Sequence, residues 1–161
     1  MKKKLKIFLT VGTHPMQFNR LVKMADEQVK NHPLKYEIVA QIGVSSDEPK
    51  HIQKWFRNCD FNEFRDYIKW ADIIISHAGA GNIITALSYK KPIIIVPRLG
   101  DLGEHTNNHQ LELAEKFKNV NGVFLNNSDK LIINFKTYKV LKVSGKEYVR
   151  LCKMLKNYLH I

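Results

Sequence analysis

Two short apolar runs in the middle of the chain place the strongest constraint on its fold. Residues 72–76 read DIIIS and residues 93–96 read IIIV, so both runs are almost wholly apolar. Such runs are typical of central strands in a parallel sheet, because helices cover both faces of that sheet and no face needs to be polar. Residues 81–89 between them have helical spacing, which predicts a right-handed crossover helix. The pattern therefore indicates an α/β fold.

The same alternation of strand and helix extends over most of the chain. Strand-like patterns occupy residues 5–11, 36–42 and 123–125, and helical spacing occupies residues 18–29, 62–71 and 108–117. We expect a Rossmann-like parallel sheet with helices on both faces. A chain of 161 residues, 44% of them hydrophobic, can bury one core but not two nucleotide-binding lobes. Ser45 to Lys50 is the only stretch that resembles a linker.

Positive charge is concentrated at the end of the chain. The formal net charge is +11, which favours an anionic partner such as phosphate or acidic lipid. After Phe135 the chain has seven lysines and arginines against the single acid Glu147. An apolar stripe runs opposite the lysines of this segment, through Tyr148, Leu151, Cys152, Leu155, Tyr158 and Leu159. We predict a domain over residues 1–146 and an amphipathic helix over 147–161 that docks a partner, the alternative being a helix folded back on its own domain.

Several classes of protein do not fit the sequence. Cys59 and Cys152 are far apart and form no metal-ligand spacing, so we expect reduced thiols, a cytoplasmic protein and no metal site. No apolar run approaches the roughly 20 residues that span a bilayer, and the start lacks the hydrophobic stretch of a signal peptide. The sequence does not favour a basic nucleic-acid-binding domain, because no stacking motif or known module accompanies the charge.

The loop of residues 77–82, HAGAGN, follows one of the central apolar runs. Ligands of open parallel sheets bind beyond the carboxyl ends of the strands, where this loop and residues 12–17, 41–45 and 97–109 are all expected. Its two glycines and the following helix N-terminus would suit a diphosphate, although glycines also serve ordinary tight turns. A dinucleotide fingerprint is incomplete, because its third glycine would fall at Ile84, and no P-loop motif is present.

Polar side chains fill the loop after the second apolar run. Candidates for reading sugar hydroxyls are Arg98, Glu104, His105, His109 and Gln110. The alternative is a solvated loop in which Asn107 or Asn108 caps the next helix. Near the first strand, His14 follows Gly12 and Thr13, where it could donate to a phosphate oxygen or act as a base.

Three segments together carry a family resemblance: TVGTHPMQFNRL at residues 10–21, ISHAGAG at 75–81, and 105–110 followed by Leu113 and Ala114. They resemble the glycosyltransferase family 28 C-terminal domain, and most closely its PssE-type group, over nearly the whole chain. The resemblance implies a single C-terminal-type lobe of the GT-B fold. It also implies an inverting, UDP-sugar-dependent hexosyltransferase of capsule or exopolysaccharide synthesis, with β-1,4-galactosyl transfer as one such reaction. The donor would be a UDP-sugar, the acceptor a lipid-linked oligosaccharide, and no other cofactor would be needed.

The resemblance also assigns roles to residues. Gly79, Ala80, Gly81 and Asn82 would contact the diphosphate, His109 and Gln110 the sugar hydroxyls, and Gly12, Thr13 and His77 would complete the substrate site, with His14 as the catalytic candidate. Gln41 and Gly43 resemble the strand end near the base, and Thr85 stands where many relatives have a glutamate for the ribose. A membrane-anchored, acceptor-binding PssD-type subunit would hold the chain at the inner face of the plasma membrane. The rival hypothesis is a non-catalytic accessory subunit.

Overall fold

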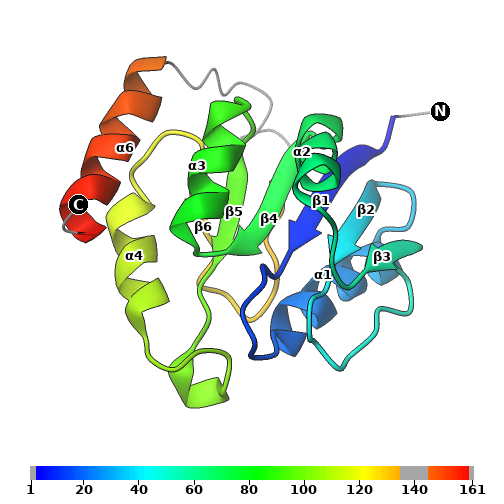
Figure 1. The fold of residues 1–161 in the computed structure, drawn as a ribbon. Helices are drawn as coiled ribbons and strands as arrows, with labels where there is room; N and C mark the ends of the chain where they lie inside the picture. The colour runs from blue at the N-terminus through cyan, green and yellow to red at the C-terminus, as the bar shows by residue number, and fades with distance from the viewer. Residues whose placement is uncertain (1–2, 135–144, 160–161) are drawn as a thin grey trace.

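A computed structural model describes residues 3–134 and 145–159 (Figure 1). Its strands and helices alternate along most of the chain, as predicted. The elements are β1 (Leu5–Thr10), α1 (Asn19–Asn31), β2 (Tyr36–Gln41), β3 (Lys54–Phe56), α2 (Phe61–Trp70), β4 (Ile73–His77), α3 (Ala80–Ser88), β5 (Ile93–Val96), the short 3₁₀ helix η1 (Gly100–Leu102), α4 (His109–Phe117), β6 (Val123–Leu125) and α6 (Gly145–Leu159).

The strands form one six-stranded sheet in the order β3-β2-β1-β4-β5-β6. Every neighbouring pair is parallel, including the central pair in which Ile7 of β1 lies opposite Ile73 of β4. This is the doubly wound order of Rossmann-like domains, in which the chain reverses its direction of travel between β1 and β4. The predicted fold class is therefore confirmed. The reversal also leaves a crevice at the carboxyl ends of these two strands.

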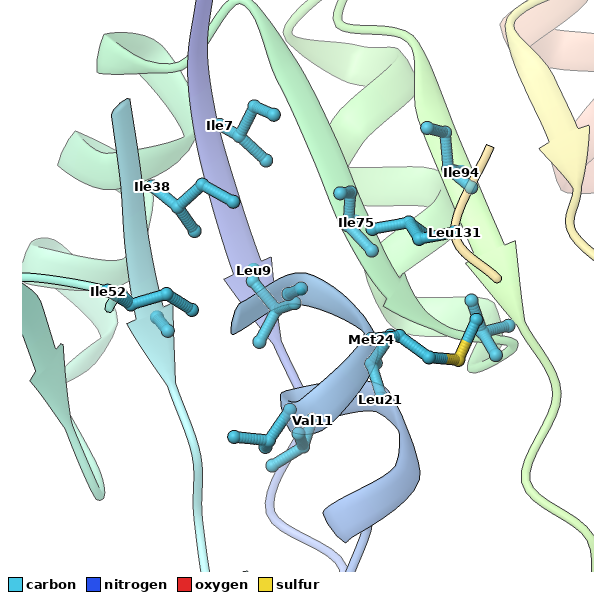
Figure 2. Close-up of a cluster of buried hydrophobic side chains, with 14 of the residues drawn as sticks. Ile7, Leu9, Val11, Leu21, Met24, Ile38, Ile52, Ile75, Ile94 and Leu131 are labelled. Atoms are coloured by element: carbon cyan, nitrogen blue, oxygen red, sulfur yellow. The ribbon is translucent and has the colours of Figure 1, made fainter. Parts of the chain in front are cut away.

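Alternating side chains of the strands build a core on each face of the sheet. On one face, Ile7 and Leu9 of β1 meet Leu21 and Met24 of α1, and Leu131 packs on the same face (Figure 2). On the other face, strand residues pack under α2, α3, α4 and α6. Both faces of the central strands are thus dry, which explains why their sequences carry almost no polar residue.

Two regions differ from the sequence-based expectation. β3 was not predicted, because a three-residue edge strand that starts with the exposed Lys54 has no clear alternation. The segment 45–50 is not a linker. Ser45 is fully buried, and the side chains of Asn19 and Asp26 accept backbone N–H groups from residues 46–47 and 50–52, respectively. The segment is fastened to α1 by these hydrogen bonds.

The C-terminal helix α6 begins at residue 145 and lies against α3 (Figure 1). Leu151 is 1% exposed and belongs to the core, and Met154 packs on its edge. Part of the predicted apolar stripe therefore folds back on the domain itself. Stripe positions 155, 158 and 159 lie outside the described side chains, and docking of a partner on α6 stays a prediction. None of the described helices is long and apolar enough to cross a bilayer.

Candidate functional site

A pocket of about 460 Å³ lies at the carboxyl ends of β1, β2 and β4, at the reversal of the sheet. Its wall combines two loops predicted from the sequence with the start of α2, which was not predicted to take part. The lining residues are Thr10, Gly12, Thr13, His14, Gln41, Cys59, Asp60, Phe61, Phe64, His77, Gly79, Gly81 and Asn82. Crevices at this point of an open α/β sheet are where ligands bind.

The ring of His77 is held between two glycines at the floor of this pocket. A Cβ atom on Gly12 would lie 2.5 Å from Cε1 of His77, and one on Gly79 would lie 2.2 Å from its Nε2. Gly12 also has φ +77°, a left-handed conformation that strains other residues. The His77 ring therefore joins the loop after β1 to the loop after β4, and both glycines are needed for it to fit.

His77 is neutral at physiological pH. Burial, together with the positive charge of Arg98, lowers its pKa to about 4. Its Nδ1 lies 3.4 Å from the side-chain nitrogen of Asn82, which also donates to the hydroxyl of Ser76 at 2.8 Å. The ring thus acts as an uncharged, fixed part of the wall rather than as a cation.

The N-terminus of α3 opens on the pocket without a side-chain cap. Its N-cap residue is Gly79, no side chain among the described residues accepts from the first amides, and no acid lies in the first turn. Gly81 and Asn82 of that first turn line the pocket. Unpaired amides at the positive end of the helix dipole are a suitable site for a phosphate group. His77, Gly79, Gly81 and Asn82 of the predicted site thus lie together at the pocket, Ala80 does not line it, and contact with a diphosphate stays a prediction.

Two histidines from distant loops stack on each other beside the pocket. The rings of His14 and His105 have centroids 4.6 Å apart and planes 26° apart. In each ring Nδ1 accepts a backbone N–H from the second residue along, Met16 in one case and Asn107 in the other. Nδ1 therefore carries the lone pair in the neutral ring, and Nε2 carries the hydrogen. Burial, His105 and Arg98 lower the pKa of His14, which keeps this donor form.

Arg98 and Glu104 lie beneath the site rather than on its surface. Arg98 is fully buried, and its guanidinium donates to the carbonyl oxygens of Val11, Met16, Gln17 and Glu104 at 2.7–3.0 Å. Burial lowers the pKa of Arg98 to about 10, so the group stays charged. The sequence analysis placed this arginine among the candidates for reading sugar hydroxyls. Its geometry instead fits a support that ties the loop after β1 to the loop after β5.

Glu104 extends this support. Its carboxylate forms a two-point ion pair with Arg20, at 2.8 and 2.9 Å, and also accepts the backbone N–H of Leu99. Only 2% of the Glu104 side chain is exposed. A carboxylate with these partners already has its acceptors occupied, so a sugar hydroxyl would have to displace them.

The other predicted sugar-reading residues are not gathered in the pocket. The side-chain oxygen of Gln110 accepts the backbone N–H of Arg98 at 3.0 Å. His109 is exposed, with Glu112 as its neighbour at 3.5 Å. The N-cap position of α4 is occupied by Asn108, one of the two asparagines of the alternative interpretation, but its side chain makes no capping hydrogen bond and accepts the backbone N–H of Gly100 instead. The side chain of Asn107 accepts the backbone N–H of His109. Within the described part of the chain, neither His109 nor Gln110 lines this pocket.

Sequence reasoning missed the wall that α2 contributes. Phe61 is 71% exposed at the first position of α2, and Phe64 packs edge-on against Phe8 at 5.5 Å. The signal that could have indicated the start of this helix is the capping box, in which Asp60 and Glu63 satisfy each other's backbone N–H groups. Nothing in the sequence indicates that this helix start faces the loops of β1 and β4, because only the sheet order brings them together.

The comparison with known proteins identifies the family. The model of the glycosyltransferase family 28 C-terminal domain matches residues 6–135. This chain belongs to that family. Human UDP-N-acetylglucosamine transferase subunit ALG13 is 34% identical over 119 residues, which cover 68% of this chain and 10% of the human protein. The pyrophosphoryl-undecaprenol N-acetylglucosamine transferase of Prochlorococcus marinus (strain MIT 9312) is 26% identical over 131 residues, covering 76% of this chain and 35% of that protein.

The fold is that of the C-terminal lobe of a GT-B glycosyltransferase. The solved structure of the glycosyltransferase of kitacinnamycin superposes with a TM-score of 0.61 at 16% identity, over 94% of this chain and 38% of that chain. This family 28 domain thus spans well under half the length of each of these three proteins. The predicted family and fold are confirmed. Because each match covers only part of the relative, it does not show that this chain has the activity of the whole relative.

Proposed function

We propose that this family 28 domain is the donor-binding part of a two-component glycosyltransferase, which moves a sugar from a UDP-sugar to a lipid-linked acceptor. The observation that carries the proposal is the pocket at the sheet reversal, where the uncapped N-terminus of α3 faces the Gly12 loop. A nucleoside diphosphate sugar has a dianionic centre between two neutral ends. That centre matches the amides of α3, and no cofactor or metal is required by this arrangement.

In this proposal the chain's contribution to catalysis is stabilisation of the departing diphosphate. The first amides of α3 would take up negative charge as the bond to the sugar breaks, with Gly79 and Asn82 setting their position. Nε2–H of His14 would add a hydrogen bond to a phosphate or sugar oxygen. A ring whose Nε2 carries the hydrogen is a donor and not a base, so we assign the general base for the acceptor hydroxyl to the partner.

The partner would cover the carboxyl edge of the sheet. Val44, Leu102 and Phe61 are 53–71% exposed in the loops and helix start that follow β2, β5 and β3. Of these three, Phe61 lines the pocket, and exposed apolar side chains at the edge of a binding pocket favour a protein surface that closes over it. A membrane-anchored PssD-type subunit is the partner that the sequence resemblance implies, and it would place the chain at the inner membrane face.

The identity of the sugar is a finer part of the proposal. The names of the two relatives above both specify N-acetylglucosamine, which favours UDP-N-acetylglucosamine as the first donor to test. Galactosyl transfer in capsule or exopolysaccharide synthesis stays a prediction of the sequence resemblance. Titration of the purified chain with UDP-N-acetylglucosamine, UDP-galactose, UDP-glucose and UDP-glucuronic acid would rank these donors by affinity.

The two cysteines provide a test of the site with an internal control. Cys59 lines the pocket and Cys152 lies on α6, and both thiols are free. We expect a UDP-sugar to slow alkylation of Cys59 by N-ethylmaleimide and to leave Cys152 unaffected, as followed by peptide mass spectrometry. Burial raises the pKa of Cys59, so the reaction is best run near pH 8.5. Equal rates at Cys59 with and without saturating ligand would place the donor elsewhere.

A transfer assay with the partner subunit separates the proposal from the accessory-subunit hypothesis. We expect product only when both components are present, and we expect Gly79→Ala to lower the rate by at least about a hundredfold. Alanine keeps the backbone amide, but its Cβ would lie 2.2 Å from Nε2 of His77 and so would shift the turn that positions the first amides of α3. The figure is the loss seen when one electrostatic stabiliser of a developing charge no longer acts. Full activity of the Gly79→Ala mixture, with the variant shown to be folded, would mean that this chain only supports a catalytic partner.

A further inference from the structure

The side chain of Gln41 is almost completely buried at the pocket floor, yet half of its amide has no protein partner. Gln41 is the last residue of β2, is 3% exposed and lines the pocket. Its Oε1 accepts the hydroxyl of Thr10 at 2.7 Å. Within the described residues no hydrogen bond from its Nε2 to a protein atom is found, and this nitrogen is not among the fully buried side-chain atoms that have no partner. The NH₂ group of this nearly buried side chain is therefore free to donate to a molecule in the pocket that Gln41 lines.

The orientation of this amide is fixed by Thr10. The Thr10 hydroxyl accepts the backbone N–H of Gly12 at 3.1 Å, so its own hydrogen must go to another acceptor. Oε1 of Gln41 is that acceptor, at a distance typical of an O–H···O hydrogen bond. The chain Gly12 to Thr10 to Gln41 therefore turns the NH₂ group, and not the carbonyl, towards the ligand space. The backbone carbonyl of Gln41 is also occupied, by the N–H of Val11.

The position of Gln41 indicates which part of a ligand it meets. β2 and β4 are separated by β1, so Gln41 lies two strand spacings, roughly 10 Å, from the strand end that leads into α3. A diphosphate on the α3 amides is too short to fill that span as well. Phe61 and Phe64 line the same pocket from α2, which follows β3, the strand next to β2, so a planar base can pack there. The polar loop with His105 follows β5, which lies beyond β4 from β2.

Other donors and acceptors around that end are already in use. The carboxylate of Asp60 accepts the amides of Asn62 and Glu63 as the cap of α2. The hydroxyl of Thr85, which stands where many relatives have a ribose-binding acid, donates to the carbonyl of Gly81 at 2.8 Å and does not line the pocket. We infer that Gln41 is a specificity-determining residue whose NH₂ group donates to an acceptor oxygen of the nucleoside, either a ribose hydroxyl or a base carbonyl. This inference rests on the proposed function of the pocket.

Two substitutions separate hydrogen-bond donation by the Gln41 NH₂ group from the packing role of the side chain. Gln41→Glu keeps an oxygen for the Thr10 hydroxyl and replaces only the NH₂ group, and Gln41→Met removes both polar atoms at similar size. We expect isothermal titration of UDP to show affinity about tenfold weaker for Gln41→Met, the value of one lost hydrogen bond, and weaker still for Gln41→Glu because its oxygen repels an acceptor. Thermal unfolding of each variant shows whether it is folded before titration.

Further ligands locate the contact. Inorganic pyrophosphate should bind wild type and Gln41→Met equally, because it has no nucleoside. If the loss of affinity caused by Gln41→Met is absent for 2′-deoxy-UDP, the contact is with the ribose 2′-hydroxyl. If the loss is present for 2′-deoxy-UDP but absent for CDP, the contact is with the 4-carbonyl of uracil. Both results support the inference. Equal UDP affinity of folded Gln41→Met and wild type, or an equal penalty for pyrophosphate, would overturn it. If wild type bound UDP no better than pyrophosphate, the proposed function itself would fail.

Discussion

At the scale of single residues, the geometry of His14 favours one of the two chemical roles that the sequence left open, hydrogen-bond donor rather than general base. Its Nδ1 accepts the N–H of Met16, so the neutral ring offers Nε2–H as a donor. We expect His14→Ala to weaken UDP-N-acetylglucosamine binding by roughly tenfold or more, the range for a hydrogen bond to a charged group. His14→Gln, whose amide can donate from a similar position, should stay within about threefold of wild type.

The pH dependence of transfer gives the same test in the proposed two-component glycosyltransferase. Because its pKa lies below the ordinary histidine value, His14 is already neutral at pH 7 and stays so at higher pH. A general base loses its free lone pair when it is protonated, and kcat/KM then falls on the acid side of the pH profile. A hydrogen-bond donor needs no free lone pair, so His14 in that role would add no such fall. We therefore expect the pH profile of kcat/KM to keep its shape in His14→Gln. A limb that vanishes in this variant, with a rate as low as that of His14→Ala, would restore His14 as the base.

The glycines around His77 give a second residue-scale prediction. A Cβ at Gly79 would collide with the His77 ring at 2.2 Å, whereas a Cβ at Gly81 would meet nothing within 4 Å. Gly79→Ala should lower the free energy of unfolding by about 1–3 kcal/mol through overpacking. Gly81→Ala, the matched control in the same turn, should raise it by up to about 1 kcal/mol, because alanine favours the helix. Equal melting temperatures for the two variants would show that His77 moves aside without cost.

At the scale of the elements, α6 is part of the domain as well as a candidate docking helix. Leu151 is buried in the core that α6 shares with α3, and Val149 on the same helix is 52% exposed. Leu151→Ala should destabilise the chain by about 2–5 kcal/mol in urea unfolding, and Val149→Ala should change stability by less than about 0.5 kcal/mol. A Leu151→Ala protein as stable as wild type would mean that α6 contributes nothing to folding of the domain and is free to bind elsewhere.

At the scale of the whole molecule, Arg98 joins loops that are more than 80 residues apart in the sequence. Its guanidinium binds Val11, Met16 and Gln17 after β1 and Glu104 after β5. Arg98→Met leaves these buried carbonyls without donors, so we expect a loss of about 3–5 kcal/mol and faster hydrogen exchange in both loops. Arg57→Met is the control, because Arg57 binds only the 43–48 loop and should affect exchange there alone. If hydrogen exchange in Arg98→Met were faster in the loop after β5 alone, Arg98 would not support both loops.

Local pattern alone determined the α/β class, most of the strands and helices, and the two glycine loops of the pocket. The apolar runs at β4 and β5 could be recognised because burial on both faces of a strand requires apolar residues. The HAGAGN turn could be recognised because a helix N-terminus that approaches a ligand requires small residues. The tertiary structure decided what those loops face. The order β3-β2-β1-β4 brings the start of α2 and the amide of Gln41 to the same crevice, and it buries Arg98 and Glu104 beneath it. A polar residue in a loop has the same sequence signature whether it binds a ligand or a backbone carbonyl, and only its neighbours across the sheet distinguish the two.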